Sequence, residues 1–304
     1  MTMATEKHRV DEAAPTSKKA LQIWFDGKLV DKSEAKVSVY DHGLLYGDGV
    51  FEGIRVYNGK IFECEWHVDR MYASAKSIRL EIPWDKKAFV KAMEETVAAN
   101  GFTDCYIRAV ATRGVGDLGI DPKKSRKPSL FIIADTIAIY PKSMYENGIA
   151  TIISSYIRNH PNSCSPRIKS LNYLNNILAK LEANDAGVPE AIMLNHNGNV
   201  AEATADNVFI VRGGTVYTPS VTDGILEGVT RGVIIKLCRK LGIPCQETQI
   251  QRHDLYIADE MFLTGSGAEV MPVTTVDKRQ IGNGTVGPTT KKLLDAFRQY
   301  IREY

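Results

Sequence analysis

Two residues of the chain have types and a spacing that could carry covalent chemistry. Lys169 lies in the run Arg-Ile-Lys-Ser-Leu-Asn-Tyr-Leu-Asn, and Glu202 follows 33 residues later in Asn-Val-Ala-Glu-Ala-Thr-Ala-Asp-Asn. A lysine amine can form a Schiff base with an aldehyde, and burial or a neighbouring cation can free it of its proton near neutral pH. A carboxylate can hold the nitrogen of a heterocycle in its protonated form. The pair therefore meets the two main needs of pyridoxal phosphate chemistry.

The sequence around both residues resembles the fold-type IV aminotransferases, in particular their branched-chain amino acid branch. The match runs from about Leu21 to Val273. The resemblance implies that Lys169 binds the cofactor and then moves the proton between the α-carbon of the amino acid and the cofactor. It also implies that Glu202 faces the pyridine nitrogen. Tyr173 becomes the partner of the cofactor's phenolic oxygen, although the enteric branched-chain enzymes have one more residue between the lysine and the tyrosine.

Other segments could bind the cofactor's phosphate, which needs positive charge and N–H donors. The N-terminus of a helix offers both, and residues 228–231, Gly-Val-Thr-Arg, open an expected helix and resemble the family's phosphate site. The resemblance also assigns phosphate contacts to Ser266, where the family usually has threonine, and to the forked donors of Arg70. Leu226 is expected to lie against the cofactor ring. The expected cofactor is pyridoxal 5′-phosphate, and its expected binding residues are Arg70, Lys169, Tyr173, Glu202, Asn207, Leu226, Val229, Thr230 and Ser266.

Two further segments resemble the family's substrate pocket. Tyr106-Ile107-Arg108 is similar to a Y-x-R strand, and residues i and i+2 of a strand point to the same face, so both side chains can line one cavity. The resemblance implies that Arg108 binds the side-chain carboxylate of glutamate and that Tyr106 helps to bind the α-carboxylate. Residues 46–55, Tyr-Gly-Asp-Gly-Val-Phe-Glu-Gly-Ile-Arg, resemble the segment that lines the side-chain pocket. The expected substrate-binding residues are Tyr46, Phe51, Arg55, Tyr106, Arg108, Gly267 and Ala268, the last two through backbone N–H groups.

The same resemblance implies a partner subunit. In the family the tyrosine at the position of Tyr46 comes from the neighbouring subunit, so a homodimer or a higher oligomer with shared active sites is the expected assembly. The glycine-rich stretch 114–119 is typical of a loop, and its Val115 and Leu118 are expected to reach across the interface. The expected small-molecule partners are amino acids and 2-oxo acids.

The composition excludes several other classes of protein. Lysine and arginine total 38 against 36 acidic residues, a formal charge of +2, which leaves no electrostatic footprint for nucleic acid. The five cysteines form no C-x-x-C pair and the histidines show no metal-ligand spacing, so neither a disulfide framework nor a metal site is expected. The longest apolar stretch, residues 130–139, is too short to cross a bilayer. These features favour a cytoplasmic protein that binds neither nucleic acid nor membranes.

The pattern of apolar and turn-forming residues predicts mostly strands in the first half of the chain. Asp26-Gly27 and Asn58-Gly59 are hairpin turns between apolar runs, and two short strands are expected after the first hairpin. Residues 105–112 and 130–139 are typical of strands, whereas residues 67–80 have helical spacing. Residues 1–20 lack an apolar core and are expected to form a disordered extension rather than a signal or transit peptide.

In the second half, strands are expected at 190–194 and 207–212, joined through an Asn197-Gly198 turn with Glu202 between them. A helix that ends at Gly187 is predicted by one apolar face, made of Leu171, Leu174, Ile177, Leu178 and Leu181. The expected fold is the two-domain α+β or α/β fold of the type IV enzymes, similar to D-amino acid aminotransferases. Its parts are a small N-terminal α/β domain at 21–136, a linker at 137–148 where proline and glycine interrupt regular structure, and a larger cofactor-binding domain at 149–304 with a β-barrel-like core.

Three hypotheses for the function follow. The first is a branched-chain L-amino acid aminotransferase that moves the amino group of leucine, isoleucine or valine to 2-oxoglutarate by ping-pong chemistry. The second is a D-amino acid aminotransferase, because Lys-Ser-Leu-Asn at 169–172 resembles that branch equally well. At the positions of 106–108, the sequences of the D-specific enzymes resemble an arginine-x-histidine pattern, whereas this chain has tyrosine and arginine. This difference argues against a D-specific enzyme, and equally against an R-selective amine transaminase or an aminodeoxychorismate lyase. The third is a cofactor-binding protein without turnover, which the intact Lys169, Glu202 and Arg70 argue against.

Overall fold

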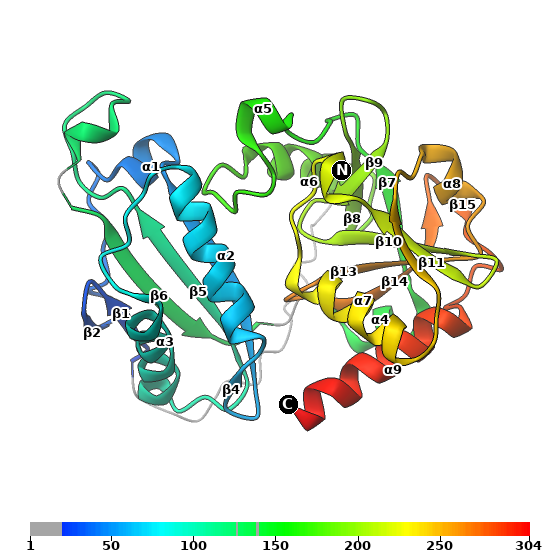
Figure 1. Cartoon of the computed structure of the whole chain (residues 1–304), viewed down its shortest axis with the longest axis horizontal. Coiled ribbons are helices and arrows are strands. Elements are labelled where there is room, and N and C mark those ends of the chain that lie inside the picture. Colours follow the sequence, from blue (N-terminus) through cyan, green and yellow to red (C-terminus); the bar gives the residue numbers. More distant parts are fainter. Residues whose placement is uncertain (1–19, 126, 138–139) are drawn as a thin grey trace, which may run out of the picture.

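The chain folds around two β-sheets that lie side by side (Figure 1). The computed structural model describes residues 20–125, 127–137 and 140–304. The predicted extension at 1–20 lies outside the described residues except for residue 20, and so do residues 138–139 of the predicted linker. Among the described residues, no helix is long and apolar enough to cross a membrane.

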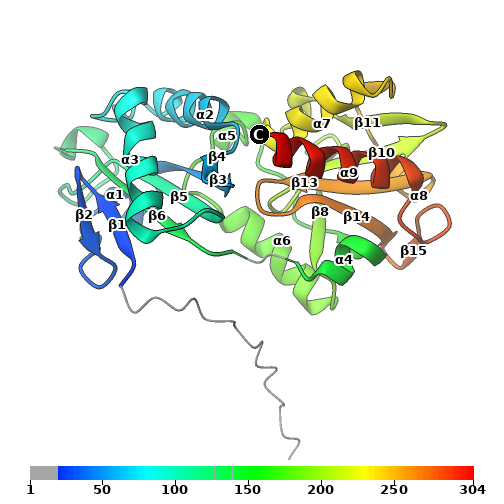
Figure 2. The same cartoon turned by 90° about the horizontal axis from the view of Figure 1, so that it is seen from below.

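The N-terminal sheet is antiparallel throughout, in the strand order β2-β1-β6-β5-β3-β4. Helices α2 and α3 cover one of its faces, and the apolar core of this half lies between them and the sheet (Figure 2). The elements are β1 (Gln22–Phe25), β2 (Lys28–Asp31), α1 (His42–Tyr46), β3 (Gly49–Tyr57), β4 (Lys60–Ile61), α2 (Cys64–Ser77), α3 (Lys86–Asn100), β5 (Cys105–Thr112), a 3₁₀ turn at Pro122–Lys124 and β6 (Ser129–Asp135).

Strand β3 alternates between the two faces of this sheet, because successive side chains of a strand point in opposite directions. Val50, Ile54 and Val56 are fully buried in the core under the helices. Phe51 and Gly53 therefore take the opposite, uncovered face. Strand β5 repeats the pattern beside it, because Gly53 pairs with Arg108 and Arg55 pairs with Tyr106 in the ladder. The uncovered face thus gathers polar and aromatic side chains from two neighbouring strands.

The C-terminal sheet closes into a six-stranded barrel, in the order β10-β13-β14-β7-β8-β9. The pairing of Glu202 on β9 with Asn207 on β10 closes the ring, and β11, β12 and β15 extend the sheet outside it. The elements are α4 (Lys142–Asn147), β7 (Ile149–Ile153), α5 (Pro161–Cys164), α6 (Leu174–Asp185), β8 (Glu190–Leu194), β9 (Val200–Ala203), β10 (Asn207–Arg212), β11 (Thr215–Pro219), a 3₁₀ turn at Val221–Asp223, α7 (Val229–Lys240), β12 (Cys245–Thr248), α8 (Arg252–Tyr256), β13 (Glu260–Gly265), β14 (Glu269–Val276), β15 (Arg279–Gln280) and α9 (Pro288–Glu303).

Helices pack on the outside of the barrel and connect it to the N-terminal sheet. Helices α7 and α9 share an apolar cluster with strands of the barrel, and Tyr57 and Phe62 of the N-terminal half belong to the same cluster. The carboxylate of Glu260 on β13 accepts hydrogen bonds from the backbone N–H groups of Thr289 and Thr290, at 3.0 and 2.6 Å. This barrel side chain therefore caps α9, whose own N-cap residue is Gly287.

The structure confirms the expected mixed α/β fold with a barrel core and corrects three local expectations. A short helix, α1, follows the first hairpin in place of the two expected strands. Glu202 lies within β9 rather than between strands. Most of the apolar face by which α6 was predicted points outward rather than into the core: Leu174, Ile177 and Leu181 are 66%, 53% and 50% exposed, whereas Asn176, Ala179 and Ala183 face inward. Apolar spacing alone does not say whether a face meets the core of its own chain or another surface.

Candidate active site

A pocket of about 600 Å³ lies against the uncovered face of the N-terminal sheet, between this sheet and the barrel. Gly53 lines the floor of this pocket and leaves room there for the side chain of Tyr106. A Cβ added at Gly53 would clash with it, at 1.8 Å from the hydroxyl oxygen of Tyr106. The pocket brings together eight of the residues expected from the sequence: Phe51, Tyr106, Arg108, Lys169, Tyr173, Ser266, Gly267 and Ala268.

Backbone pairing with β3 holds the segment that carries Lys169. The carbonyl of Lys169 accepts the N–H of Phe51 at 2.9 Å, and the N–H of Leu171 donates to the carbonyl of Gly49 at 3.0 Å. The amine of Lys169 lies 3.2 Å from the hydroxyl of Tyr173 and 4.6 Å from the centre of the Phe51 ring. The lysine therefore enters the pocket on an ordered backbone, with its amine beside a phenol and over an aromatic face.

The carboxylate of Glu202 is buried and held by three partners. Arg158 donates from Nε at 2.7 Å, Asn207 donates from its side-chain amide at 3.2 Å, and the N–H of Leu226 donates at 2.9 Å. Both charged side chains are only 5% exposed. Sequence reasoning missed Arg158, because it stands alone in an irregular segment and no spacing relates it to Glu202. Asn207, expected to bind the cofactor, directly orients this carboxylate in the structure.

The N-terminus of α7 has the properties of a phosphate site. The helix starts at Val229, its N-cap Gly228 supplies no side-chain cap, and Val229 and Thr230 are 2% and 3% exposed. Buried N–H groups without a capping partner match a bound anion. The buried hydroxyl of Thr264, two residues before Ser266, also has no hydrogen-bond partner among the described residues. The residues present therefore fit a phosphate group.

Arg70 lies beside this helix start and belongs to a buried polar cluster. Its Nη1 donates to the carbonyl of Glu227 at 2.8 Å, and its Nε and Nη2 donate to the two oxygens of Glu52, each at 2.7 Å. Burial raises the pKa of the Glu52 carboxyl, but the charge and hydrogen bonds of Arg70 outweigh it and hold that pKa well below its usual range. Sequence reasoning placed Glu52 only inside a motif and gave it no role.

Comparison with known proteins agrees with this geometry. A model of the family described as amino-transferase class IV matches residues 49–276. The chain belongs to this family.

Individual class IV relatives cover almost the whole chain. A Methanocaldococcus jannaschii protein, provisionally named a branched-chain-amino-acid aminotransferase, is 50% identical over 91% of this chain and 96% of its own length. The branched-chain-amino-acid aminotransferase of Escherichia coli (strain K12) is 37% identical over 93% of both chains. A crystal structure of the T.th. branched-chain amino acid aminotransferase with pyridoxamine 5′-phosphate superposes with a TM-score of 0.90, at 39% identity over 93% of this chain and 94% of that one.

Two residues of the expected substrate set lie apart from the pocket lining of this class IV chain. Arg55 follows Phe51 and Gly53 on the uncovered face of β3, with its guanidinium 4.8 Å from the Tyr57 ring centre. Tyr46, at the end of α1, is 37% exposed, and its hydroxyl accepts the N–H of Gly119 at 2.8 Å. Tyr46 thus faces the glycine-rich loop of its own chain and solvent, outside the pocket.

Two acidic residues that the sequence did not single out also line the pocket. Asp206 is 7% exposed and Glu190 is 2% exposed. Burial and the neighbouring charge of Glu190 raise the pKa of Asp206 to about 8, and burial also raises the pKa of Glu190. An unfolded aspartate loses its proton near pH 4. Between these values the folded chain holds a proton that the unfolded chain has released, so stability falls as the pH rises.

We expect Asp206→Asn to remove this pH dependence, because an amide stays neutral. The free energy of unfolding of the variant should increase relative to that of the wild type as the pH rises from about 4 to about 8, because only the wild type loses stability over this range. Urea unfolding across this range measures it, with the exposed Asp295→Asn as control. A difference that does not change with pH would show that the native carboxyl titrates normally.

Proposed function

We propose that the protein is a branched-chain L-amino acid aminotransferase, which transfers the amino group of leucine, isoleucine or valine to 2-oxoglutarate with pyridoxal 5′-phosphate. The observation that carries the proposal is a lysine amine 3.2 Å from a tyrosine hydroxyl, in a pocket that also contains Arg108. The names of the relatives support it, and the T.th. enzyme has also been solved as a complex with N-(5′-phosphopyridoxyl)-L-glutamate. D-amino acid transfer is the alternative, which a test on D-alanine addresses.

The cofactor-binding residues would act from three sides. Lys169 would hold the cofactor covalently, the N-terminus of α7 with Ser266 and Arg70 would hold its phosphate, and Leu226 would lie against its ring. The Glu202 carboxylate, fixed by Arg158 at 2.7 Å, would face the pyridine nitrogen and favour its protonated form. When bound, pyridoxal phosphate supplies the acceptor for the electron pair left as the α C–H bond of the amino acid breaks.

Lys169 is the residue that moves the proton. Its Nζ takes the α-proton of the amino acid and delivers it on the cofactor side, a role of general base and then general acid. The hydroxyl of Tyr173 at 3.2 Å orients the amine, and the Phe51 ring 4.6 Å away shields it from water. A lysine held by a paired backbone loses little entropy in reaching both positions.

The pocket must accept an aliphatic side chain and the carboxylate of glutamate in one place. The guanidinium of Arg108 lies 4.6 Å from the centre of the Phe51 ring, and its Nη2 is 3.4 Å from the Tyr106 hydroxyl. An arginine stacked on an aromatic ring offers an apolar wall and a charged edge. Aliphatic side chains pack against Phe51 and Val110, and the distal carboxylate of glutamate or 2-oxoglutarate binds the guanidinium edge.

A homodimer would complete this site, in a cytoplasmic enzyme with domains at 21–136 and 149–304 joined by residues 137–148. Large apolar side chains stand exposed on two parts of the chain: Leu44, Leu45, Tyr46, Val115 and Leu118 in the N-terminal half, and Leu174, Ile177 and Leu181 on α6. Several large exposed apolar side chains on one short helix, as on α6, are typical of an interaction surface. Ile177 also lines the pocket, so a second copy that covers α6 would close it and supply Tyr46.

We expect Lys169→Ala to abolish transamination of L-leucine with 2-oxoglutarate by at least about a thousandfold, because the proton then has no carrier. The variant should still bind the cofactor through its phosphate, without a covalent link. Mass spectrometry after borohydride reduction checks the link, and steady-state rates check turnover. Normal turnover, or label on another lysine, would remove the assignment. Turnover of D-alanine but not L-leucine by the wild type would favour the D-specific alternative.

We expect Arg108→Ala to lower kcat/KM for glutamate and 2-oxoglutarate about tenfold to a hundredfold more than kcat/KM for leucine, since only the former lose a charge-assisted contact. The exposed Arg302→Ala serves as the control for removal of a positive charge. Equal losses on both substrate classes would show that Arg108 does not bind the distal carboxylate.

We expect the wild type to be a dimer and Leu174→Asp to be more monomeric and less active, because the substitution places a charge on the exposed apolar face of α6. Leu29→Asp, at a partly exposed position on β2 in the N-terminal sheet, is the matched control. Light scattering after size-exclusion chromatography measures the mass. A wild type that is monomeric and fully active would contradict the shared site.

A further inference from the structure

We infer that Glu52 is a positioning residue for cofactor binding, which fixes the guanidinium of Arg70 in the orientation that the phosphate needs. Glu52 lies behind the pocket rather than in it, on the face of β3 that α2 covers, and its side chain is fully buried. The inference rests on the proposed function, in which Arg70 binds the phosphate of pyridoxal 5′-phosphate.

The geometry of the pair determines where the arginine can point. Nε and Nη2 of Arg70 each donate to a different oxygen of Glu52 at 2.7 Å, which is the forked, two-bond arrangement. Nη1 donates to the carbonyl of Glu227 at 2.8 Å, directly before the N-terminus of α7. The side chain of Arg70 is 10% exposed. The plane of the guanidinium is therefore set by Glu52, and its outer edge meets the helix start.

The contacts leave donors free for a ligand. A guanidinium carries five N–H groups. Three of them are engaged by the two oxygens of Glu52 and the carbonyl of Glu227, so one N–H remains on each terminal nitrogen. Two N–H groups on neighbouring nitrogens match two oxygens of a phosphate. Rotation of the guanidinium out of the plane set by Glu52 would lose that match.

His67 is the third member of the cluster and keeps the carboxylate charged. Its Nδ1 lies 2.8 Å from Oε2 of Glu52, and its side chain is 1% exposed. Burial lowers the pKa of His67 despite the neighbouring carboxylate. A neutral imidazole donates one hydrogen bond without competing for the charge of Glu52. The carboxylate is thus held from two sides, by His67 and by Arg70, both on α2.

Electrostatics alone predicts that loss of the Glu52 charge would strengthen phosphate binding, whereas the orientation role predicts that it would weaken it. The direction of the change in affinity therefore tests the inference. A carboxylate in contact with Arg70 cancels much of its positive charge and should weaken its attraction for an anionic phosphate. If Glu52 acted only through charge, its neutralisation would tighten binding of a phosphorylated ligand. If it acts by orientation, neutralisation breaks the fork and weakens binding.

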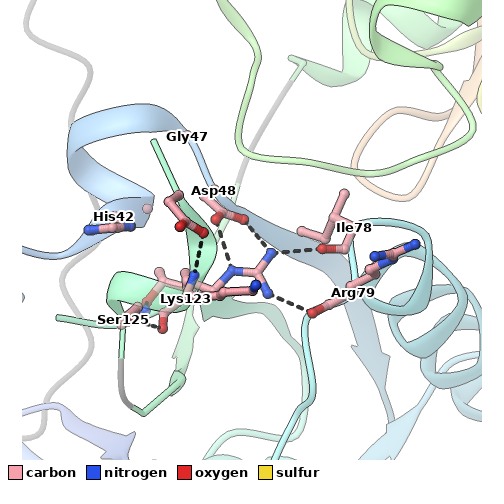
Figure 3. Close-up of polar contacts among 12 residues, drawn as sticks. His42, Gly47, Asp48, Ile78, Arg79, Lys123 and Ser125 are labelled. Carbon is pink, nitrogen blue, oxygen red and sulfur yellow. Dashed lines mark hydrogen bonds and ion pairs between the residues drawn. The ribbon is translucent and has the colours of Figure 1, made fainter. Parts of the chain in front are cut away.

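A second ion pair of the same chemistry provides the matched control. Asp48 receives Nε and Nη2 of Arg113, both at 2.8 Å, and Arg113 also donates to the carbonyls of Ile78 and Arg79 (Figure 3). Arg113 is 8% exposed. This pair also joins elements of the N-terminal half, but Arg113 lines a separate cleft, away from the lysine pocket and α7. Its loss should disturb the fold locally without altering how phosphate is bound.

The experiment compares two ligands on the apoprotein: pyridoxamine 5′-phosphate, which forms no covalent link to lysine, and pyridoxamine, which lacks the phosphate. We expect Glu52→Gln to raise the dissociation constant of the phosphorylated ligand about 10- to 100-fold, as loss of an outer orienting partner does at other sites. Binding of pyridoxamine should stay unchanged. Asp48→Asn should leave both dissociation constants at their wild-type values.

A double-mutant cycle with Arg70→Ala tests whether Glu52 acts through the arginine. In the Arg70→Ala background, Glu52→Gln should cause no further loss of affinity for pyridoxamine 5′-phosphate. Glu52→Asp keeps the charge but shortens the side chain, so it should also weaken binding of the phosphorylated ligand without affecting pyridoxamine. This variant replaces Glu52→Gln in the test if the glutamine variant does not fold.

Three outcomes would overturn the inference. These are tighter binding of pyridoxamine 5′-phosphate by Glu52→Gln, equal losses for both ligands, and additive losses in the Arg70→Ala background. A wild-type protein that binds neither ligand would instead overturn the proposed function, and the inference with it. The two failures are therefore distinguishable in one titration series.

Discussion

The alternation of side chains along β3 is the constraint on which the rest of the site depends. Its odd-numbered positions send Phe51 and Gly53 into the pocket, and its even-numbered positions send Val50, Ile54 and Glu52 under α2. The same strand pairs by backbone with the segment that carries Lys169. One strand thus positions the Lys169 segment, the pocket floor and the carboxylate partner of Arg70. A slip by one residue would exchange all of them at once, so the buried core on the covered face also specifies the site.

Buried ion pairs join the elements that no continuous strand or helix connects. Glu202 and Arg158 tie the barrel closure to the segment before α5, Glu52 and Arg70 tie β3 to α2, and Asp48 and Arg113 tie the start of β3 to the end of β5. Burial of two charges costs several kcal/mol per ion, so such pairs are poor contributors to stability. What they supply is a single orientation for long side chains. For the Glu202–Arg158 and Glu52–Arg70 pairs, this is the property that a site with a ring nitrogen at one end and a phosphate at the other requires.

Local signals in the sequence were sufficient to single out Lys169 and Glu202 as candidates and to predict many of the strands. The hairpin turn at Asp26-Gly27 and the strand at 105–112 follow from turn chemistry and β-branched runs, and both are confirmed. Arg158 and the partnership of Glu52 with Arg70 could not be predicted, because they depend on contacts between segments far apart in the sequence. The barrel core was expected from the family resemblance alone, because no local signal in the sequence indicates that β9 pairs with β10 to close the ring. The outward orientation of the apolar face of α6 could not be predicted for a different reason. A period of 3.6 residues identifies an apolar face of a helix but not what covers that face.

The exposed face of α6 and the uncovered face of the N-terminal sheet have a common cause, because the chain leaves the pocket side of this sheet only partly covered. A sheet that is covered on one side by α2 and α3 leaves its other side for ligands, and the barrel walls off only part of it. Ile177, which lines the pocket, is therefore left 53% exposed by the rest of the described chain. A single copy that closed this side with its own residues would seal the pocket against substrate. In the proposed homodimer, closure by a second copy would keep an entry path between subunits while still excluding water from the amine of Lys169, the proposed proton carrier.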